Sequence, residues 1–184
     1  GVDLDIFRVQ EAHVLNSAHP IFLYVGRVAV EKNIEAFLKL DLPGSKWVAG
    51  EGPQLAELRS RYPDVNYLGM LSQPELAKVY ASADVFVFPS RTDTFGLVLL
   101  EAMACGLPVA AYPVTGPIDV LDGCPEGDAG ALREDLREAC LDALKVSRAS
   151  ARAWAERFSW QAASEEFVSH LHPRKPEPSL AHAI

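Results

Sequence analysis

The sequence has few of the residues on which disulfide-stabilised, metal-binding and membrane-spanning proteins depend. Its 184 residues include three cysteines, Cys105, Cys124 and Cys140, an odd number without the spacing of a metal site. This usage favours reduced thiols, the ordinary state in the cytosol. No run reaches the ~18 apolar residues that a membrane span needs, because Glu101 and Gly106 interrupt the longest candidate.

Basic residues are also fewer than acidic residues. Lysine and arginine number 17 against 25 aspartates and glutamates, which gives a net charge of −8. Such a chain repels polyanions, which excludes extensive nucleic-acid binding but permits a local basic pocket for one diphosphate. A hydrophobic content of 49% and a charged content of 23% are typical of one globular domain with a substantial core.

The sequence does contain a regular alternation of strand-like and helix-like segments. Short apolar runs predict strands at residues 21–25, 46–49, 65–68, 85–88 and 109–112. Helical patterns occupy residues 34–40, 54–61, 95–105, 135–144, 148–158 and 161–171, and another helix begins at residue 72. The alternation predicts an α/β fold: a Rossmann-like, open, mainly parallel sheet with helices on both faces.

Two local patterns refine this assignment. Ser72 is followed three residues later by Glu75, a capping-box pattern that marks the start of a helix. Further along, Asp119, Asp122 and Asp128 are irregularly spaced. This spacing favours a flexible, solvated loop over a metal-binding cluster.

Polar, glycine-bearing segments follow each expected strand. They are residues 26–27, 50–53, 69–72, 90–96 and 113–116. In an open parallel sheet, ligands bind beyond the carboxyl ends of the strands, and helix N-termini at that edge supply amide donors for anions. In PSRTDTFGLVLLEAMACGLPVAAYPVTG, residues 89–116, Asp93 and Glu101 flank such a helix start. This combination suits a ligand that carries both phosphate and sugar hydroxyls.

These motifs resemble a known family. GRVAVEKN at residues 26–33, followed by the Asp93 and Glu101 stretch, is similar to the C-terminal, donor-binding half of retaining GT-B glycosyltransferases of family 4, the glycosyl transferases group 1. The resemblance runs from GVDLDIF at residues 1–7 to ERFSW at residues 156–160 and beyond. It implies a connection from a missing N-terminal acceptor domain (1–12), a nucleotide-sugar-binding domain (13–158), a C-terminal helix (159–172) and a disordered tail (173–184).

The resemblance also implies roles for the charged residues. Arg27 and Lys32 would hold the donor diphosphate, which suits a bidentate guanidinium and a compact ammonium; the alternative is a solvated basic pair at a helix start. Glu101 would accept hydrogen bonds from the ribose hydroxyls; the alternative is a satisfied buried glutamate. Asp93 stands where the family usually has glutamate beside the donor sugar, so this contact is altered; the alternative is an aspartate that caps the following helix.

Other residues complete the implied site. Backbone amides of Thr94, Phe95, Gly96 and Leu97 would contact phosphate and sugar, with Leu97 under the ribose. Met70, Leu71 and Gln73 would lie near the nucleobase. The predicted donor-binding residues are Gly26, Arg27, Lys32, Met70, Leu71, Gln73, Asp93, Thr94, Phe95, Gly96, Leu97 and Glu101. The five histidines, His13, His19, His170, His172 and His182, fall outside these motifs, so neither a metal nor another cofactor is expected.

The predicted function is the donor-binding half of a retaining glycosyltransferase, with Asp93, Arg27 and Lys32 as catalytic residues. It would move a hexosyl unit from GDP-mannose or a UDP-hexose to a hydroxyl acceptor, and the isolated domain would be inactive. We expect a cytoplasmic protein, with peripheral membrane contact through the missing domain. Two alternatives stay open: a sugar-nucleotide epimerase, which would bring a histidine to the cleft, and a non-catalytic nucleotide-binding module, which the altered Asp93 would suit.

Overall fold

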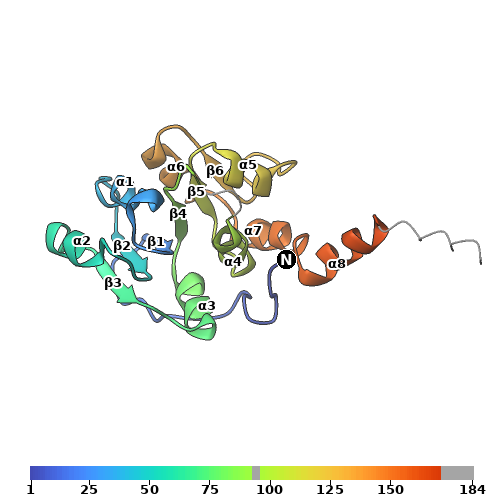
Figure 1. Cartoon of the computed structure of the whole chain (residues 1–184), viewed down its shortest axis with the longest axis horizontal. Coiled ribbons are helices and arrows are strands. Elements are labelled where there is room, and N and C mark those ends of the chain that lie inside the picture. The colour runs from blue at the N-terminus through green and yellow to red at the C-terminus, as the bar shows by residue number, and fades with distance from the viewer. Residues whose placement is uncertain (93–95, 171–184) are drawn as a thin grey trace, which may run out of the picture.

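The sheet of this protein is entirely parallel. The computed structural model describes residues 1–92 and 96–170 (Figure 1). Its six strands have the order β3-β2-β1-β4-β5-β6. They are β1 (Ile21–Val25), β2 (Ser45–Ala49), β3 (Asn66–Gly69), β4 (Val85–Phe88), β5 (Val109–Ala111) and β6 (Gly130–Leu132). This order is that of a doubly wound Rossmann fold, and it confirms the predicted fold class.

The expected helices are present, with ends that differ by a few residues. They are α1 (Ile34–Leu38), α2 (Leu55–Arg61), α3 (Gln73–Ser82), α4 (Leu97–Ala104), α6 (Leu136–Ala143), α7 (Arg148–Glu156) and α8 (Trp160–Ser169). A 3-10 turn, η1 (Val30–Lys32), precedes α1. The predicted capping box begins α3, where the Ser72 amide donates to Glu75 Oε2 at 2.9 Å. The predicted disordered tail, residues 173–184, lies outside the described residues.

The prediction of a solvated loop after residue 116 holds for residues 122–128, which form mostly exposed turns and include Asp122 and Asp128, but it is wrong for Asp119 and for residues 130–132. Residues 115–132 contain helix α5 (Thr115–Leu121) and the edge strand β6. Val120 and Ala129 are fully buried, and Ala131 is buried in β6, which pairs with β5. Glycine, proline and aspartate in this stretch give a local signal for turns, and tertiary packing of a few small apolar side chains overrides it.

Side chains alternate between the two faces of the sheet. In β1, Ile21, Leu23 and Val25 join the cluster under α3, α4, α5 and α7, which we call the first face. Phe22 and Tyr24 join the cluster under α1, α2 and α6, which we call the second face. Both faces are therefore covered by helices, as the buried apolar strands require.

The N-terminal segment packs on the first face. Val2, Phe7 and Leu15 are buried there. The Val2 amide donates to the Phe158 carbonyl at 2.8 Å, and Arg152 Nη1 donates to the Phe7 carbonyl at 2.9 Å. The segment expected to connect two domains is thus attached beside α7 and the start of α8 (Figure 1).

One arginine of α7 joins the ends of α3 and α4. Arg148 Nη1 donates to the Ala83 carbonyl at 2.6 Å, and Nη2 donates to the carbonyls of Ala81 at 3.0 Å and Cys105 at 3.3 Å. Carbonyls at helix C-termini lack partners within the helix, so this guanidinium satisfies them. Burial lowers the pKa of Arg148. The contact holds α3 and α4 in a fixed relation.

Candidate functional site

The loops after β1 and β4 meet at the point where the strand order reverses. The helix that follows β1 covers the second face, and the helix that follows β4 covers the first, which leaves a crevice between the loops. Asn33 Nδ2 donates to the Pro89 carbonyl at 3.0 Å. Thr92 Oγ1 donates to the Glu31 carbonyl at 3.4 Å. These side-chain contacts set the spacing of the crevice.

A cavity of about 270 Å³ lies in this crevice, and we call it the switch cavity. Among its lining residues are four predicted site residues, Gly26, Arg27, Lys32 and Gly96. Gly96 is the N-cap of α4, so the amide end of that helix lies with the two cations. Positive charge and the helix dipole therefore converge at the edge of the sheet where the sequence predicts an anion site.

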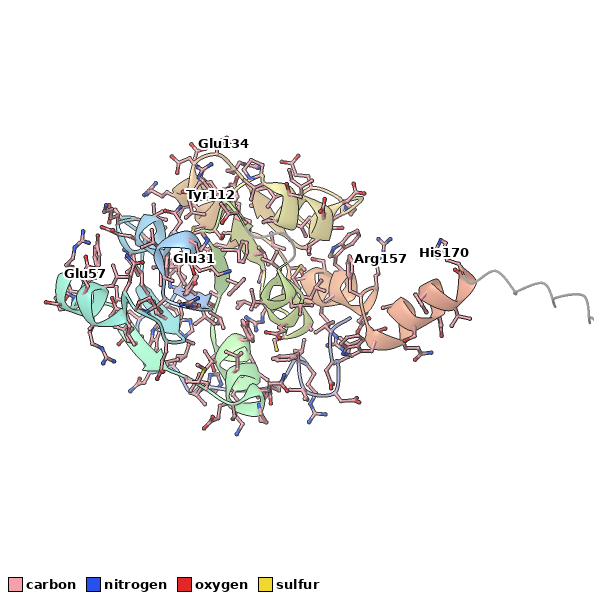
Figure 2. The ribbon with its side chains drawn as sticks, in the orientation of Figure 1. Glu31, Glu57, Tyr112, Glu134, Arg157 and His170 are labelled. Atoms are coloured by element: carbon pink, nitrogen blue, oxygen red, sulfur yellow. The ribbon has the colours of Figure 1, made fainter. Side chains whose placement is uncertain are left out.

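The side chain of Arg27 is accessible from the switch cavity. Its backbone carbonyl accepts a hydrogen bond from the Tyr24 hydroxyl at 2.8 Å, which anchors the loop. The guanidinium is 65% exposed and lies 3.6 Å from Glu31 Oε1, a carboxylate that is itself 54% exposed. Glu31, labelled in Figure 2, lies on η1. An ion pair between two exposed side chains contributes little, so Arg27 can turn toward an anion. Lys32 is half-buried at the end of η1.

A larger cavity of about 570 Å³ adjoins the switch cavity and shares Val25, Gly26 and Arg27 with it. We call it the apolar cavity, because most of its side chains are aliphatic: Val25, Ala49, Met70, Leu71 and Leu76. Gly50 brings two loops together here, since a Cβ at this position would lie 2.0 Å from the Gly26 carbonyl oxygen. A planar apolar group fits such walls.

Glu101 lines a third cavity of about 140 Å³, which we call the acid cavity. Gln73 and Leu97 line it too, with Trp160 from α8 and residues of the N-terminal segment. The structure therefore separates Gln73 from Met70 and Leu71, with which the nucleobase prediction had grouped it. The first turn of α4 spans two cavities, since Gly96 lines the switch cavity and Leu97 the acid cavity.

The half-buried Glu101 carboxylate has a partner that the sequence analysis missed. The Tyr80 hydroxyl donates to Glu101 Oε2 at 3.2 Å. Burial raises the pKa of Glu101, and the hydrogen bond from Tyr80 partly opposes that rise. Burial, followed by the nearby Glu101 charge, raises the pKa of Tyr80 well above its usual range. The sequence contains one signal for this contact: a tyrosine at an apolar position of a predicted helix. A buried hydroxyl requires a hydrogen-bond partner, so such a tyrosine indicates a polar group nearby.

Three predicted site residues, Asp93, Thr94 and Phe95, lie outside the described residues, and their roles stay predictions. Within residues 1–92 and 96–170, no group of three or more histidines, cysteines, aspartates or glutamates is placed to hold a metal ion. In the same residues, no helix is both long enough and apolar enough to cross a membrane. The cysteines Cys105, Cys124 and Cys140 are free thiols.

Known proteins match this chain in sequence. A family model described as glycosyl transferases group 1 matches residues 19–146. The sulfoquinovosyl transferase SQD2 of Arabidopsis thaliana is 34% identical over 89% of this chain and 37% of its own length. The GDP-mannose-dependent alpha-mannosyltransferase of Corynebacterium glutamicum is 32% identical over 84% of this chain and 40% of its own length. The chain thus spans less than half the length of these relatives.

A solved structure matches the fold. The sucrose-phosphate synthase from Thermosynechococcus elongatus superposes with a TM-score of 0.73 and 26% sequence identity. The match covers 92% of this chain and 50% of that protein. The likeness agrees with the predicted Rossmann-like half of a GT-B fold.

Proposed function

The chain belongs to the glycosyl transferases group 1 family, and on this premise we propose that it is the donor-binding half of a retaining glycosyltransferase. The observation that carries the proposal is the convergence of Arg27, Lys32 and the amide end of α4 on the switch cavity. Two cations and a helix N-terminus in one crevice suit a diphosphate. The donor is then a nucleoside-diphosphate sugar.

The neighbouring cavities suit the rest of the donor. The nucleobase occupies the apolar cavity, whose aliphatic walls accept the face of a flat ring. Glu101 accepts hydrogen bonds from the ribose hydroxyls, as the family resemblance implies. Asp93, with Thr94 and Phe95, contacts the sugar.

The reaction transfers a hexosyl unit from the donor to a hydroxyl group with retention of configuration. Arg27 and Lys32 stabilise the negative charge that develops on the departing nucleoside diphosphate. The leaving phosphate assists the incoming hydroxyl on the same face of the sugar. Groups that bind the acceptor belong to an N-terminal domain outside this chain, so the chain alone binds the donor without efficient transfer.

The epimerase alternative requires a histidine at the cleft. The described residues that line the switch, apolar and acid cavities include no histidine. This favours group transfer over acid–base epimerisation. The basic side chains and the helix dipole supply the positive charge at the diphosphate, so the proposal involves no metal.

Calorimetric titration of the chain with UDP, GDP and ADP tests the proposal. We expect one nucleotide to bind selectively and Arg27→Ala to weaken that binding by about tenfold or more, because a charge-assisted phosphate contact is lost. Arg59→Ala is the matched control. Arg59 belongs to α2, its guanidinium lies over the Tyr67 ring, and it lines none of the three cavities. Absence of binding at millimolar concentration, or equal affinity for the Arg27 variant, contradicts the proposal.

A further inference from the structure

Tyr80 places a hydroxyl group in the apolar core between α3 and α4. The residue is 0% exposed. Its ring packs edge-on against Phe7, at 6.1 Å between centroids, and against Phe86, at 5.7 Å. Phenylalanine would fill the same space without bringing a polar group into the core, and a buried polar group is costly unless it is paired. The hydroxyl therefore points to a role beyond packing.

The partner of this hydroxyl lies at a cavity wall. Glu101 Oε2 accepts from Tyr80 at 3.2 Å, and Glu101 also lines the acid cavity. Among the described residues, Tyr80 is the one hydrogen-bond partner of this carboxylate. An ionised carboxylate has about four acceptor sites, so most of its capacity remains for a ligand.

The position of the Tyr80 hydroxyl is set from several directions. Phe7 and Phe86 flank the ring, and Arg148 ties the C-terminal ends of α3 and α4 together. A free glutamate side chain samples several rotamers and loses that freedom when it binds a ligand. A carboxylate already held by a fixed donor binds without that loss, which is the advantage of preorganisation.

We propose that Tyr80 is a positioning residue of the nucleotide site, whose hydroxyl holds Glu101 in the orientation that accepts hydrogen bonds from the ribose hydroxyls of the donor. The proposal rests on the ribose role given to Glu101 in the proposed function. The fully buried Tyr80 side chain would then affect the binding of the ribose diol and of no other part of the ligand.

The test compares nucleotides that differ only in the diol. UDP and GDP are titrated beside their 2′,3′-dideoxy forms into the wild-type chain, Tyr80→Phe and Glu101→Gln. We expect the wild type to prefer the ribonucleotide by about tenfold or more, as for hydrogen bonds to a charged group. Glu101→Gln abolishes this preference. Tyr80→Phe reduces it by about fivefold and leaves the affinity for the dideoxynucleotide unchanged.

Tyr62→Phe is the matched control. The Tyr62 hydroxyl donates to Glu35 Oε1 at 2.9 Å, the same chemical contact on the second face, and neither residue lines the three cavities. This variant keeps the wild-type preference. Thermal unfolding of each variant verifies that it is folded.

The outcomes separate the inference from the proposed function. If Glu101→Gln loses the preference while Tyr80→Phe keeps it, the positioning role is overturned and the ribose role of Glu101 stands. If Glu101→Gln keeps the preference, the ribose role fails and the inference fails with it. If Tyr80→Phe does not fold, the preference for the ribonucleotide is measured with p-aminophenylalanine and with p-methylphenylalanine at residue 80. These two side chains share a shape, and only the first donates a hydrogen bond. Equal preferences in that pair overturn the inference.

Discussion

Each face of the sheet contains a tyrosine that donates a hydrogen bond to a glutamate, and the two glutamates have opposite properties. On the second face, Glu35 accepts from Tyr62 and lies 3.0 Å from Lys39 Nζ. These contacts, led by Lys39, lower the pKa of Glu35 to about 2. On the first face, Glu101 accepts only from Tyr80 among the described residues, and burial raises its pKa.

The comparison shows that the surroundings, and not the hydrogen bond, decide what a glutamate can do. Glu35 also contacts Arg61 at 2.5 Å, so its charge is already balanced by two cations. Glu101 is half-buried beside a cavity, where desolvation dominates. A carboxylate with a perturbed pKa and spare acceptor capacity in a cleft is a candidate for ligand binding, whereas the Glu35 cluster is structural.

The largest expected effect comes from removing the arginine that organises the first face. Arg148→Ala should lower the free energy of unfolding by about 3 kcal/mol, because three helix-end carbonyls lose their donor, and two of them belong to the buried residues Ala83 and Cys105. Urea denaturation measures the change. Arg157→Ala is the control: Arg157, labelled at the end of α7 in Figure 2, is exposed over the Trp154 ring at 4.3 Å. Loss of the Arg157 side chain should lower the free energy of unfolding by about 0.5–1 kcal/mol. Equal decreases for Arg148→Ala and Arg157→Ala would contradict the organising role of Arg148.

The next effect is a pH dependence of opposite sign on the two faces. The folded pKa of Glu35, about 2, lies below its ordinary value of 4.5, so its stabilisation is present above 4.5 and is lost as pH falls toward 2. The folded pKa of Glu101 is raised, so its contribution is fully present below about 4.5 and is lost as pH rises through the folded value.

Urea midpoints measured between pH 3 and pH 7 check both signs. Glu35→Gln should lessen the loss of stability on acidification, because the variant has no carboxylate to protonate. Glu101→Gln should lessen the loss on the alkaline side of pH 4.5. If both substitutions changed the slope of stability against pH in the same direction, the Glu35 and Glu101 carboxylates would not differ in the sign of their pKa shifts, and the prediction would be contradicted.

The smallest effect concerns the exposed ion pair beside the switch cavity. Glu31→Gln should change the free energy of unfolding by less than ~0.5 kcal/mol, since both partners of the Arg27–Glu31 pair face solvent. Nucleotide affinity should rise by at most about twofold as Arg27 is released. Glu57→Gln, which removes an exposed pair with Arg61, should leave the affinity unchanged. A stability loss above ~1 kcal/mol for Glu31→Gln would argue for a structural role of this pair.

The sequence predicts some elements closely and misses others for a physical reason. Strand β4 is predicted at its observed residues, Val85–Phe88, because four consecutive apolar residues between turn signals read as a buried strand. Helix α5 is missed because Gly116, Pro117 and Asp119 within it give turn signals, and strand β6 is missed because it spans only Gly130–Leu132. Their stability comes from packing against β5 and α4, which no local window contains.

The site shows the same division. Arg27, Lys32 and Gly96 are predicted from motifs and do line one cavity. Tyr80 is not predicted, because its hydroxyl gains meaning only from its distance to Glu101, on another helix.

Most of the alternation of strands and helices follows from the sequence alone, with α5 and β6 as the exceptions. So do the polar loops at one edge of the sheet and the family motifs within them. These depend on periodicity and on turn chemistry, which neighbouring residues along the chain decide. Folding adds two features that no local pattern contains. The loops after β1 and β4 meet through Asn33 and Pro89, and one glutamate is desolvated while another is surrounded by cations. Desolvation and charge pairing depend on residues that are distant in sequence and close in space, so they emerge only when the chain has folded.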